Sequence, residues 1–243
     1  MRLDVYLADK GICASRTEAK GFISTGEVTV NGKIITKPSF DVSDEDVICV
    51  NSKSKKYVSR GGLKLEEAIN RFHVSASGRH AIDVGASSGG FTDCLLQCGA
   101  SHILAIDSGS GQMALSLRCD QRVTVIENYN ARYMKPEDFA YVPDLAVMDV
   151  SFISSTLIMP ALYSCLAPGA DFICLIKPQF EVGRSGLGKG GIVKSDKLRN
   201  DAVDRVVSFA SSIGFEFLGV INSPIAGGDG NIEFLAHFRK GKE

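Results

Sequence analysis

Two residues that could carry chemistry, Asp149 and Lys177, follow short apolar runs in the second half of the chain. The runs at 144–149 and 171–176 are typical of buried strands, so both side chains should lie where a strand ends. Open α/β sheets bind their ligands at this edge. Each residue also has an ordinary interpretation, a strand-end lysine that reaches solvent and an aspartate that caps the next helix.

A glycine-rich turn precedes these residues in the chain. It reads DVGASSGGF from Asp83 to Phe91, between a predicted strand and a predicted helix, where glycines let a ligand approach the backbone closely. Asp107 follows 22 residues after Gly85, at the end of the next predicted strand, where an acid can hydrogen-bond ribose hydroxyls. Because Ser87 breaks the dinucleotide pattern G-x-G-x-x-G, we expect a nucleotide-type ligand of another kind.

Alternating strands and helices would position these residues. Predicted strands lie at 81–84, 102–106, 123–126, 144–149, 171–176, 216–221 and 232–238. Predicted helices lie near 90–98, 112–118, 153–166 and 196–212. Such alternation favours a doubly wound parallel α/β sheet, Rossmann-like, over residues 63–243.

Residues 1–52 read as a separate small α/β module. Ser15 and Glu18 fit a capping box at the start of a short helix. Asn31-Gly32 separates two β-rich runs and predicts a tight hairpin, since a type I′ turn needs positive φ at both positions. A further strand at 46–50 would complete the module.

Positive charge gathers in two segments. A predicted linker at 53–62 opens the stretch from Lys53 to Lys64, which has five Lys/Arg and no acid, and Tyr57 there could stack on a base. A glycine-rich stretch from Gly183 has P-loop spacing, but Gly190 stands where Ser or Thr would bind Mg²⁺, so we interpret it as a loop. Both segments suit contact with RNA, although solvated surface charge would look the same.

The first module resembles the S4 RNA-binding domain. The matching motifs are Arg2-Leu3-Asp4, Ser15-Arg16 with Ala19-Lys20, and Gly26-x-Val28-x-Val30-Asn31-Gly32. This resemblance implies that the helix and the hairpin face RNA phosphates. Together with the two basic segments, it predicts RNA contacts from Arg2, Arg16, Lys20, Lys33, Lys55, Lys56, Arg60, Arg184 and Lys189.

The larger domain resembles the FtsJ-like ribose methyltransferases, which use S-adenosylmethionine. The motifs that carry this resemblance are the turn after Asp83 and Asp149-Val150-Ser151-Phe152-Ile153. Three further motifs narrow it to the TlyA family: Ser59-Arg60-Gly61-Gly62-x-Lys64-Leu65, Lys177-Pro178-Gln179-Phe180-Glu181 and Gly230-Asn231-x-Glu233. The resemblance implies S-adenosyl-L-methionine at Asp83, Gly85, Ala86, Ser87, Gly89, Gly90, Phe91, Asp107, Ser108 and Asp149.

The same resemblance implies a catalytic tetrad of Lys64, Asp149, Lys177 and Glu233. A ribose 2′-hydroxyl is a weak acid, and a lysine desolvated beside another cation can act as its base. We therefore expect Lys177 to be the base, with Lys64 lowering its pKa. Asp149 and Glu233 would hold the two ammonium groups.

The expected function is 2′-O-methylation of a ribose, of cytidine by resemblance, in ribosomal RNA of one or both subunits. A methyltransferase acting on base amino groups is not favoured, because Asp149-Val150-Ser151-Phe152 lacks the prolines of the motif that such enzymes carry. Two alternatives are a non-catalytic RNA-binding protein of ribosome assembly and a membrane-active haemolysin, a label attached to this family.

Composition sets outer limits on these expectations. The 27 Lys+Arg against 28 Asp+Glu give a net charge of −1, so charge favours nucleic acid only where it is clustered. Seven scattered cysteines without a C-x-x-C pair predict no structural metal. An acid at position 4 and the lack of a long apolar run predict a cytoplasmic protein with no membrane partner.

Overall fold

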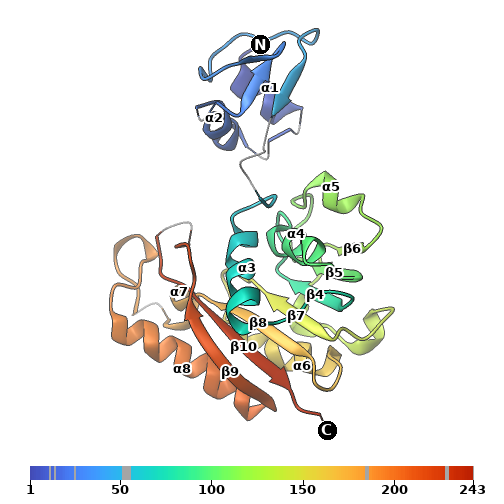
Figure 1. The fold of residues 1–243 in the computed structure, drawn as a ribbon. Coiled ribbons are helices and arrows are strands. Elements are labelled where there is room, and N and C mark those ends of the chain that lie inside the picture. The colour runs from blue at the N-terminus through green and yellow to red at the C-terminus, as the bar shows by residue number, and fades with distance from the viewer. Residues whose placement is uncertain are drawn as a thin grey trace. The chain divides into compact units, whose positions relative to one another are not determined.

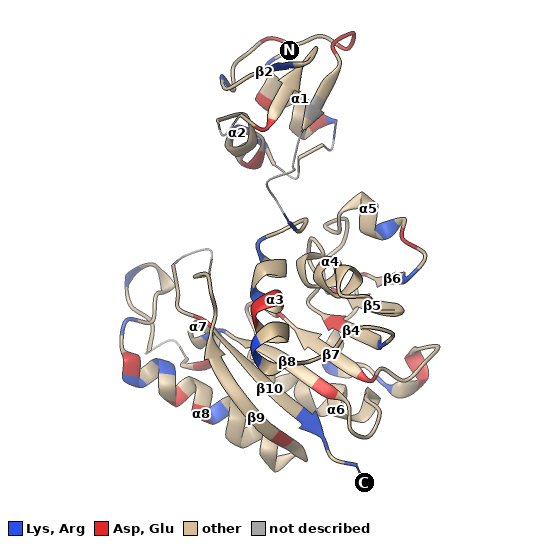
Figure 2. Ribbon diagram, in the orientation of Figure 1, with Lys and Arg blue, Asp and Glu red and all other residues tan. Residues whose placement is uncertain are grey.

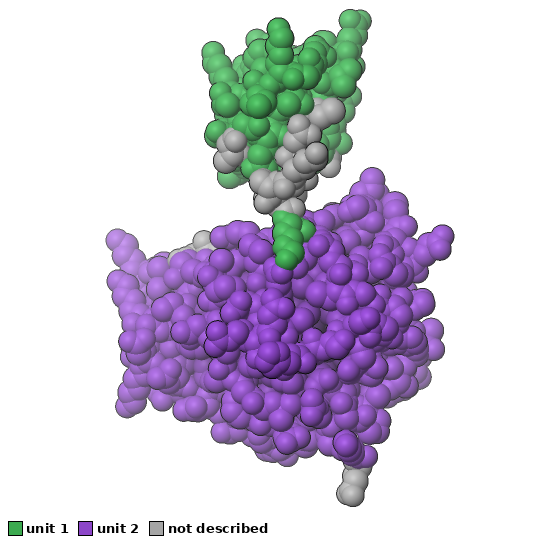
Figure 3. All heavy atoms as spheres, viewed as in Figure 1, with its two compact units in different colours: residues 1–56 green, residues 57–243 purple. Residues whose placement is uncertain are grey.

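The computed structural model describes residues 1–10, 12–13, 15–24, 26–50, 56–183, 186–227 and 230–242. The chain forms two compact units, Met1–Lys56 and Tyr57–Glu243, drawn in different colours in Figure 3. Each unit has its own core and is described by itself.

The first unit is a three-stranded antiparallel sheet with two helices. Its elements are α1 (Leu3–Asp9), α2 (Arg16–Ser24), β1 (Val28–Val30), β2 (Lys33–Ile34) and β3 (Ile48–Val50), with strand order β2-β1-β3. The predicted hairpin is confirmed, since Asn31 and Gly32 have φ of 51° and 78°. The Ser15 hydroxyl accepts from the Glu18 amide at 3.2 Å, as the capping box predicts. Leu3, Leu7 and other apolar side chains fill a small core.

The second unit is built on a seven-stranded sheet (Figure 1). Its strands are β4 (His80–Val84), β5 (His102–Ile106), β6 (Val123–Ile126), β7 (Leu145–Met148), β8 (Asp171–Ile176), β9 (Phe215–Asn222) and β10 (Phe234–Lys240). Its α-helices are α3 (Gly61–Phe72), α4 (Gly90–Gln97), α5 (Leu115–Arg118), α6 (Met159–Cys165), α7 (Pro178–Glu181) and α8 (Asp196–Ser212). Short 3₁₀ turns are η2 (Ala131–Tyr133), η3 (Pro136–Asp138), η4 (Ser155–Leu157) and η6 (Lys189–Gly191).

The strand order is β6-β5-β4-β7-β8-β10-β9, which confirms the doubly wound α/β prediction with one correction. Strands β4 to β8 are parallel, but β10 runs antiparallel to both β8 and β9. A parallel return needs a crossover of roughly a dozen residues or more, usually a helix. The short connection between Asn222 and Phe234 leaves no room for one, so the chain reverses direction there.

Two apolar cores cover the two faces of this sheet. Successive strand residues contribute to opposite cores: Ile82 packs with Leu162 of α6 and Val206 of α8, while Ala81 packs with Leu65 of α3. This alternation follows from the period of two along a strand. It holds α3 and α4 on one face, where the two helices pack against each other, α3 beside β10 and α4 beside β4 and β5.

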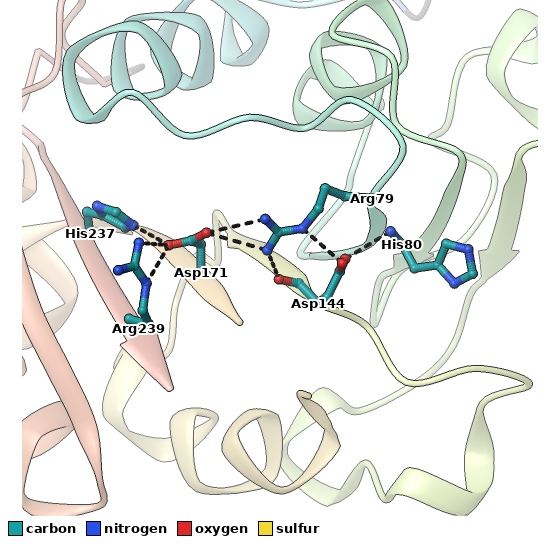
Figure 4. Close-up of polar contacts among 6 residues, drawn as sticks. All are labelled: Arg79, His80, Asp144, Asp171, His237 and Arg239. Atoms are coloured by element: carbon teal, nitrogen blue, oxygen red, sulfur yellow. Dashed lines mark hydrogen bonds and ion pairs between the residues drawn. The ribbon is translucent and has the colours of Figure 1, made fainter. Parts of the chain in front are cut away.

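The opposite edge of the sheet carries a charge network around the buried Asp171 (Figure 4). Asp171, at the start of β8, accepts from His237 Nε2 at 3.0 Å and from Arg239 at 2.9 Å, both of β10. Arg79 joins Asp171 to Asp144, which precedes β7. Burial raises the pKa of Asp171, but the hydrogen bonds from His237 and Arg239 outweigh it and lower that pKa to about 2. The network ties the antiparallel strand to the parallel ones.

In the described part of the chain, no helix has the length and apolar character that a membrane crossing takes. Over the same residues, no group of three or more His, Cys, Asp or Glu side chains could hold a metal ion.

Candidate active site

Two adjoining cavities open at the carboxyl ends of the parallel strands. The Asp107 cavity, of about 460 Å³, reaches from the end of β4 past Asp107 to Tyr129 and the loop after β7. The Lys64 cavity, of about 280 Å³, lies among the starts of α3 and α4, Asp149 and Lys177. Four residues line both cavities: Gly85, Ser87, Asp149 and Ser151. The predicted edge of the sheet therefore holds one two-lobed site.

The four residues of the predicted tetrad come together here as two ion pairs. Lys64 Nζ lies 2.5 Å from Glu233 Oε2, and Lys177 Nζ lies 2.6 Å from Asp149 Oδ1. Lys64, Asp149 and Lys177 line the Lys64 cavity, while Glu233 is buried and contacts Lys64. Helix α3 brings in Lys64 from far along the chain, because its apolar side packs on the sheet face next to β10.

Ser151 is a site residue that the sequence reasoning did not single out. Its hydroxyl accepts a hydrogen bond of 2.7 Å from Lys177 Nζ, whereas the Asp149 contact is an ion pair without hydrogen-bond alignment. The Lys177 ammonium group is thus held by two oxygens of one loop. A hydroxyl two residues after a strand-end aspartate was the signal available in the sequence.

The glycine-rich turn gives the site an open backbone wall. Gly85 has φ of +85°, and a Cβ there would lie 2.5 Å from the backbone oxygen of Asp149. Gly89, before α4, has φ of +94°, and a Cβ would lie 2.2 Å from Leu117 Cδ1. Neither position accommodates a side chain, as the turn prediction required. Gly90, Phe91 and Ala86 line the Lys64 cavity.

Asp107 and Ser108 lie where β5 ends and line the Asp107 cavity. Asp107 Oδ2 accepts from the Ser87 amide at 2.8 Å, and Oδ1 accepts from the Gly109 amide at 2.7 Å. The carboxylate therefore joins the glycine-rich turn to the loop after β5. Gln112, which accepts from the Ser87 hydroxyl at 3.0 Å, is a second cavity residue that the sequence reasoning missed.

Asp83 lies beneath the turn rather than in a cavity. It is fully buried, lines neither lobe, and accepts a hydrogen bond of 2.6 Å from Thr92 Oγ1 of α4. Burial raises the pKa of Asp83 to about 7, and the hydrogen bond from Thr92 opposes this only in part. The structure gives Asp83 a place in supporting the turn. Gly89 also lines neither cavity and contributes through the start of α4.

The Asp107 cavity fits the nucleoside part of S-adenosylmethionine. An acid at the end of the second strand suits a ribose diol, and the walls at Ile106 and Ile158 are apolar, as an adenine ring requires. The turn at Gly85 offers backbone without a Cβ beside Asp149, at the junction with the Lys64 cavity. The junction is therefore where a methyl donor would meet an acceptor.

Two of the predicted RNA-contacting residues bind a buried acid. Asp4 is fully buried and accepts from Arg2 Nε and Arg16 Nε, each at 2.9 Å, while the two arginine side chains are 46% and 51% exposed. These hydrogen bonds, that from Arg2 most of all, lower the pKa of Asp4 to about 2 although burial opposes them. The motif at position 4 thus carries a structural acid that the sequence reasoning did not recognise.

The other predicted RNA-contacting residues have more open surroundings. Lys20, Lys33, Lys56 and Lys189 are exposed, and Arg60 lines the Lys64 cavity. Lys55 and Arg184 lie outside the described residues. Figure 2 shows lysine and arginine in both units, in keeping with a near-neutral chain whose charges are unevenly placed.

Comparison with known proteins gives two family matches. The model of the FtsJ-like methyltransferases matches residues 57–240, and that of the S4 domain matches residues 1–48. Among curated relatives, the putative rRNA methyltransferase YqxC of Bacillus subtilis is 47% identical over 97% of this chain and 84% of its own. The 16S/23S rRNA (cytidine-2′-O)-methyltransferase TlyA of Mycobacterium tuberculosis is 42% identical over 98% of this chain and 89% of its own.

A solved structure covers the whole chain. A putative hemolysin from Streptococcus thermophilus is 43% identical and superposes with a TM-score of 0.79, over 100% of this chain and 89% of that one. The matches to relatives named as rRNA methyltransferases and to a structure named as a putative hemolysin therefore extend over both units of this chain.

Proposed function

The chain belongs to the FtsJ-like methyltransferase family, and on this premise we propose that it methylates a ribose 2′-hydroxyl, of a cytidine, in ribosomal RNA of one or both subunits. The observation that carries the proposal is the two lysine–carboxylate contacts, Lys177 with Asp149 at the junction of the two cavities and Lys64 with Glu233 at the wall of the Lys64 cavity. A relative named as an rRNA (cytidine-2′-O)-methyltransferase supports the substrate. Since ribosomal RNA would be the substrate, a cytoplasmic location is part of the proposal.

S-adenosylmethionine, when bound, supplies an electrophilic methyl group on a sulfonium centre. Residues of the Asp107 cavity would hold it, with Asp107 and Ser108 toward the ribose and the turn from Gly85 beside the remainder. Ala86, Gly90 and Phe91 would bound the same ligand on the Lys64 side. Holding donor and acceptor in line can lower the barrier by roughly 7–11 kcal/mol in favourable cases.

Lys177, as the neutral amine, would take the proton of the acceptor hydroxyl while the bond from oxygen to the methyl carbon forms and the bond from that carbon to sulfur breaks. Asp149 and Ser151 fix its Nζ at the junction: the two N–H groups of the amine can point to these two oxygens, which leaves its lone pair for the acceptor proton. Lys64, held by Glu233, adds a fixed positive charge on the other side of the cavity. This charge would stabilise the oxygen as its proton leaves.

The S4 domain would supply the RNA contacts that are remote from the reaction. Domains of this kind present exposed cations to phosphates, and Lys20 and Lys33 are exposed in this unit. Arg2 and Arg16 would contact phosphate with the half of each side chain that Asp4 leaves exposed.

The experiment is methyl transfer to purified ribosomal subunits, with the modified nucleotide mapped by mass spectrometry. Lys177→Ala should lower the rate by about 10²-fold or more, as loss of a general base does. Lys197→Ala, which removes an exposed lysine of α8, is the matched control and should leave the rate unchanged. Wild-type rate in a folded, cofactor-binding Lys177→Ala protein would refute the assignment.

The non-catalytic alternative makes a different prediction, because a protein of ribosome assembly that only binds RNA needs no methyl donor. Calorimetric titration with S-adenosylmethionine separates the two, since the proposal requires binding and the alternative requires none. A haemolysin would instead have to lyse lipid vesicles as a purified protein. The described structure offers no observation in favour of either alternative.

A further inference from the structure

Glu181 is a buried carboxylate beside the candidate site that belongs to neither ion pair. It is the last residue of α7, the short helix that begins directly after Lys177, and it is 6% exposed. A buried charge is costly unless it is hydrogen-bonded. The hydrogen-bond donors to the Glu181 carboxylate therefore indicate its role.

Three neutral donors from the loop after β7 hold this carboxylate. Oε2 accepts from the Ser154 hydroxyl at 2.5 Å, and Oε1 accepts from the Ser155 amide and the Ser155 hydroxyl, both at 2.9 Å. Ser154 and Ser155 stand at the start of η4, just beyond the segment that carries Asp149 and Ser151. Glu181 thus caps the end of the loop that holds the Lys177 ammonium group.

The loop after β7, residues 149–155, and the segment after β8, residues 177–181, touch at three successive points. Lys177 contacts Asp149 and Ser151 at one end. The rings of Phe152 and Phe180 lie 5.3 Å apart in the middle. At the far end, Glu181 receives its three hydrogen bonds. The two loops therefore run alongside one another, and only the Glu181 contact is polar and buried away from the cavities.

Helix α8 fixes the Glu181 end of this arrangement. Arg205 Nη1 donates to the backbone oxygen of Glu181 at 2.6 Å, and Val206 beside it is fully buried in the core. Glu181 therefore links two parts of the fold: its backbone is bound to α8 and its side chain is bound to the loop after β7.

We propose that Glu181 is a positioning residue for methyl transfer: it fixes the loop after β7 so that Asp149 and Ser151 hold Lys177 at the junction of the two cavities. The inference rests on the proposed function, because it assigns a role in that reaction. Its geometric part, that Glu181 orders residues 149–155, can be tested without reference to methyl transfer.

Kinetics test the role in the reaction. A misplacement of about 1 Å can cost 10²-fold in rate, so we expect Glu181→Gln to lower kcat by roughly 10-fold and Glu181→Ala by about 100-fold. Gln keeps one acceptor oxygen and should rescue part of the loss. The KM for ribosomal RNA should change by less than about threefold, since Glu181 lines neither cavity. The Kd for S-adenosylmethionine should rise by a smaller factor than kcat falls, because residues 149–153 line the Asp107 cavity but Glu181 does not.

Two comparisons separate positioning from general stability. Asp171→Asn removes an equally buried carboxylate from the network in Figure 4, at the opposite edge of the sheet, and should leave kcat of the folded protein unchanged. In a Lys177→Ala background, Glu181→Gln should lower kcat by less than about twofold further, because residues that act as a unit are not additive. Equal losses in Asp171→Asn and Glu181→Gln, or full additivity with Lys177→Ala, would overturn the proposal.

Hydrogen exchange tests the geometric part without any methyl transfer. Glu181→Ala should speed amide exchange in peptides covering 149–155, and leave exchange in β5 at 102–106 unchanged. Unchanged exchange at 149–155 would overturn the inference whatever the kinetics show. If wild-type protein methylates no ribosomal subunit, the proposed function fails, while faster exchange in the variant would still support the ordering role.

Discussion

The two lysine–carboxylate pairs of the site differ in their distance from water. The side chains of Lys64 and Glu233 are 10% and 2% exposed, whereas those of Lys177 and Asp149 are 12% and 22% exposed. Removing one partner of a buried pair leaves a charge with neither a counter-ion nor water. Asp149 lines the Lys64 cavity, where water can take its place, whereas Glu233 is buried and lines no part of that cavity. The same substitution should therefore have unequal effects at the two pairs.

Glu233→Gln should lower the free energy of unfolding by about 3–5 kcal/mol, because it leaves Lys64 buried and unpaired. Asp149→Asn should lower it by less, because Lys177 lines the Lys64 cavity and keeps the Ser151 hydroxyl as a partner. Urea denaturation of each variant measures the difference. Both variants should lose methyl transfer. Equal losses of stability would contradict the view that the Lys64–Glu233 pair supports the fold more than the Lys177–Asp149 pair does.

The buried acid beneath the turn gives a pH dependence. The folded pKa of Asp83 is about 7, above its ordinary value of 3.8. The folded protein therefore keeps a proton that the unfolded chain loses, so the contribution of Asp83 is fully present below pH 4 and is lost as pH rises through 7. Asp83→Asn, which mimics the protonated acid, should flatten stability between pH 4 and 8. Unfolding midpoints measured across this range check it, and a curve parallel to wild type would contradict the assignment.

At the scale of elements, the sequence pattern predicted the strands well and their directions less well. Apolar runs at 102–106 and 171–176 coincide with β5 and β8, because buried parallel strands are mostly apolar. The run at 123–126 coincides with β6, which lies at the edge of the sheet and is only partly buried. The antiparallel course of β10 was not predicted, since a strand's residue pattern carries no direction. The buried state of Asp4 was missed because one of its two partners, Arg16, comes from α2, twelve residues further along the chain.

The tight turn at Gly85 allows a controlled test of an element. Gly85→Ala adds a Cβ 2.5 Å from the Asp149 backbone oxygen at φ of +85°, while Gly78→Ala adds one at φ of +74° with nothing within 4 Å. Both substitutions carry a similar backbone penalty of about 1–3 kcal/mol. Only Gly85→Ala should also weaken S-adenosylmethionine binding. Its Kd should rise by about 10-fold or more, which corresponds to about 1.4 kcal/mol of binding free energy. Calorimetry on both variants separates the penalty from the clash, and equal cofactor affinity would show that the turn lies away from the ligand.

At the scale of the whole molecule, the net charge says less about RNA binding than the positions of the charged residues do. The chain has 27 basic and 28 acidic residues, yet many of the acids have internal tasks. Asp171 joins strands, Asp107 ties two loops and Asp4 receives two arginines. Acids bound in this way contribute to the total charge but present little of it to a ligand. Exposed lysines are then free to dominate local binding.

The first unit should contain two kinds of cation, those that contact only RNA and those that also pair with a buried acid. Lys20→Ala and Lys33→Ala should each weaken RNA binding across sequences and reduce the slope of log affinity against log salt by about 1, as for one phosphate contact. Arg16→Ala should do the same and also lower the unfolding midpoint at neutral pH, because Asp4 loses one of its two partners. Lys242→Ala, at an exposed position of the second unit, should change neither quantity. Binding titrations at several salt concentrations, beside urea denaturation, measure both effects. A salt slope unchanged by Lys20→Ala and Lys33→Ala would show that the S4 domain does not contact phosphate through these side chains.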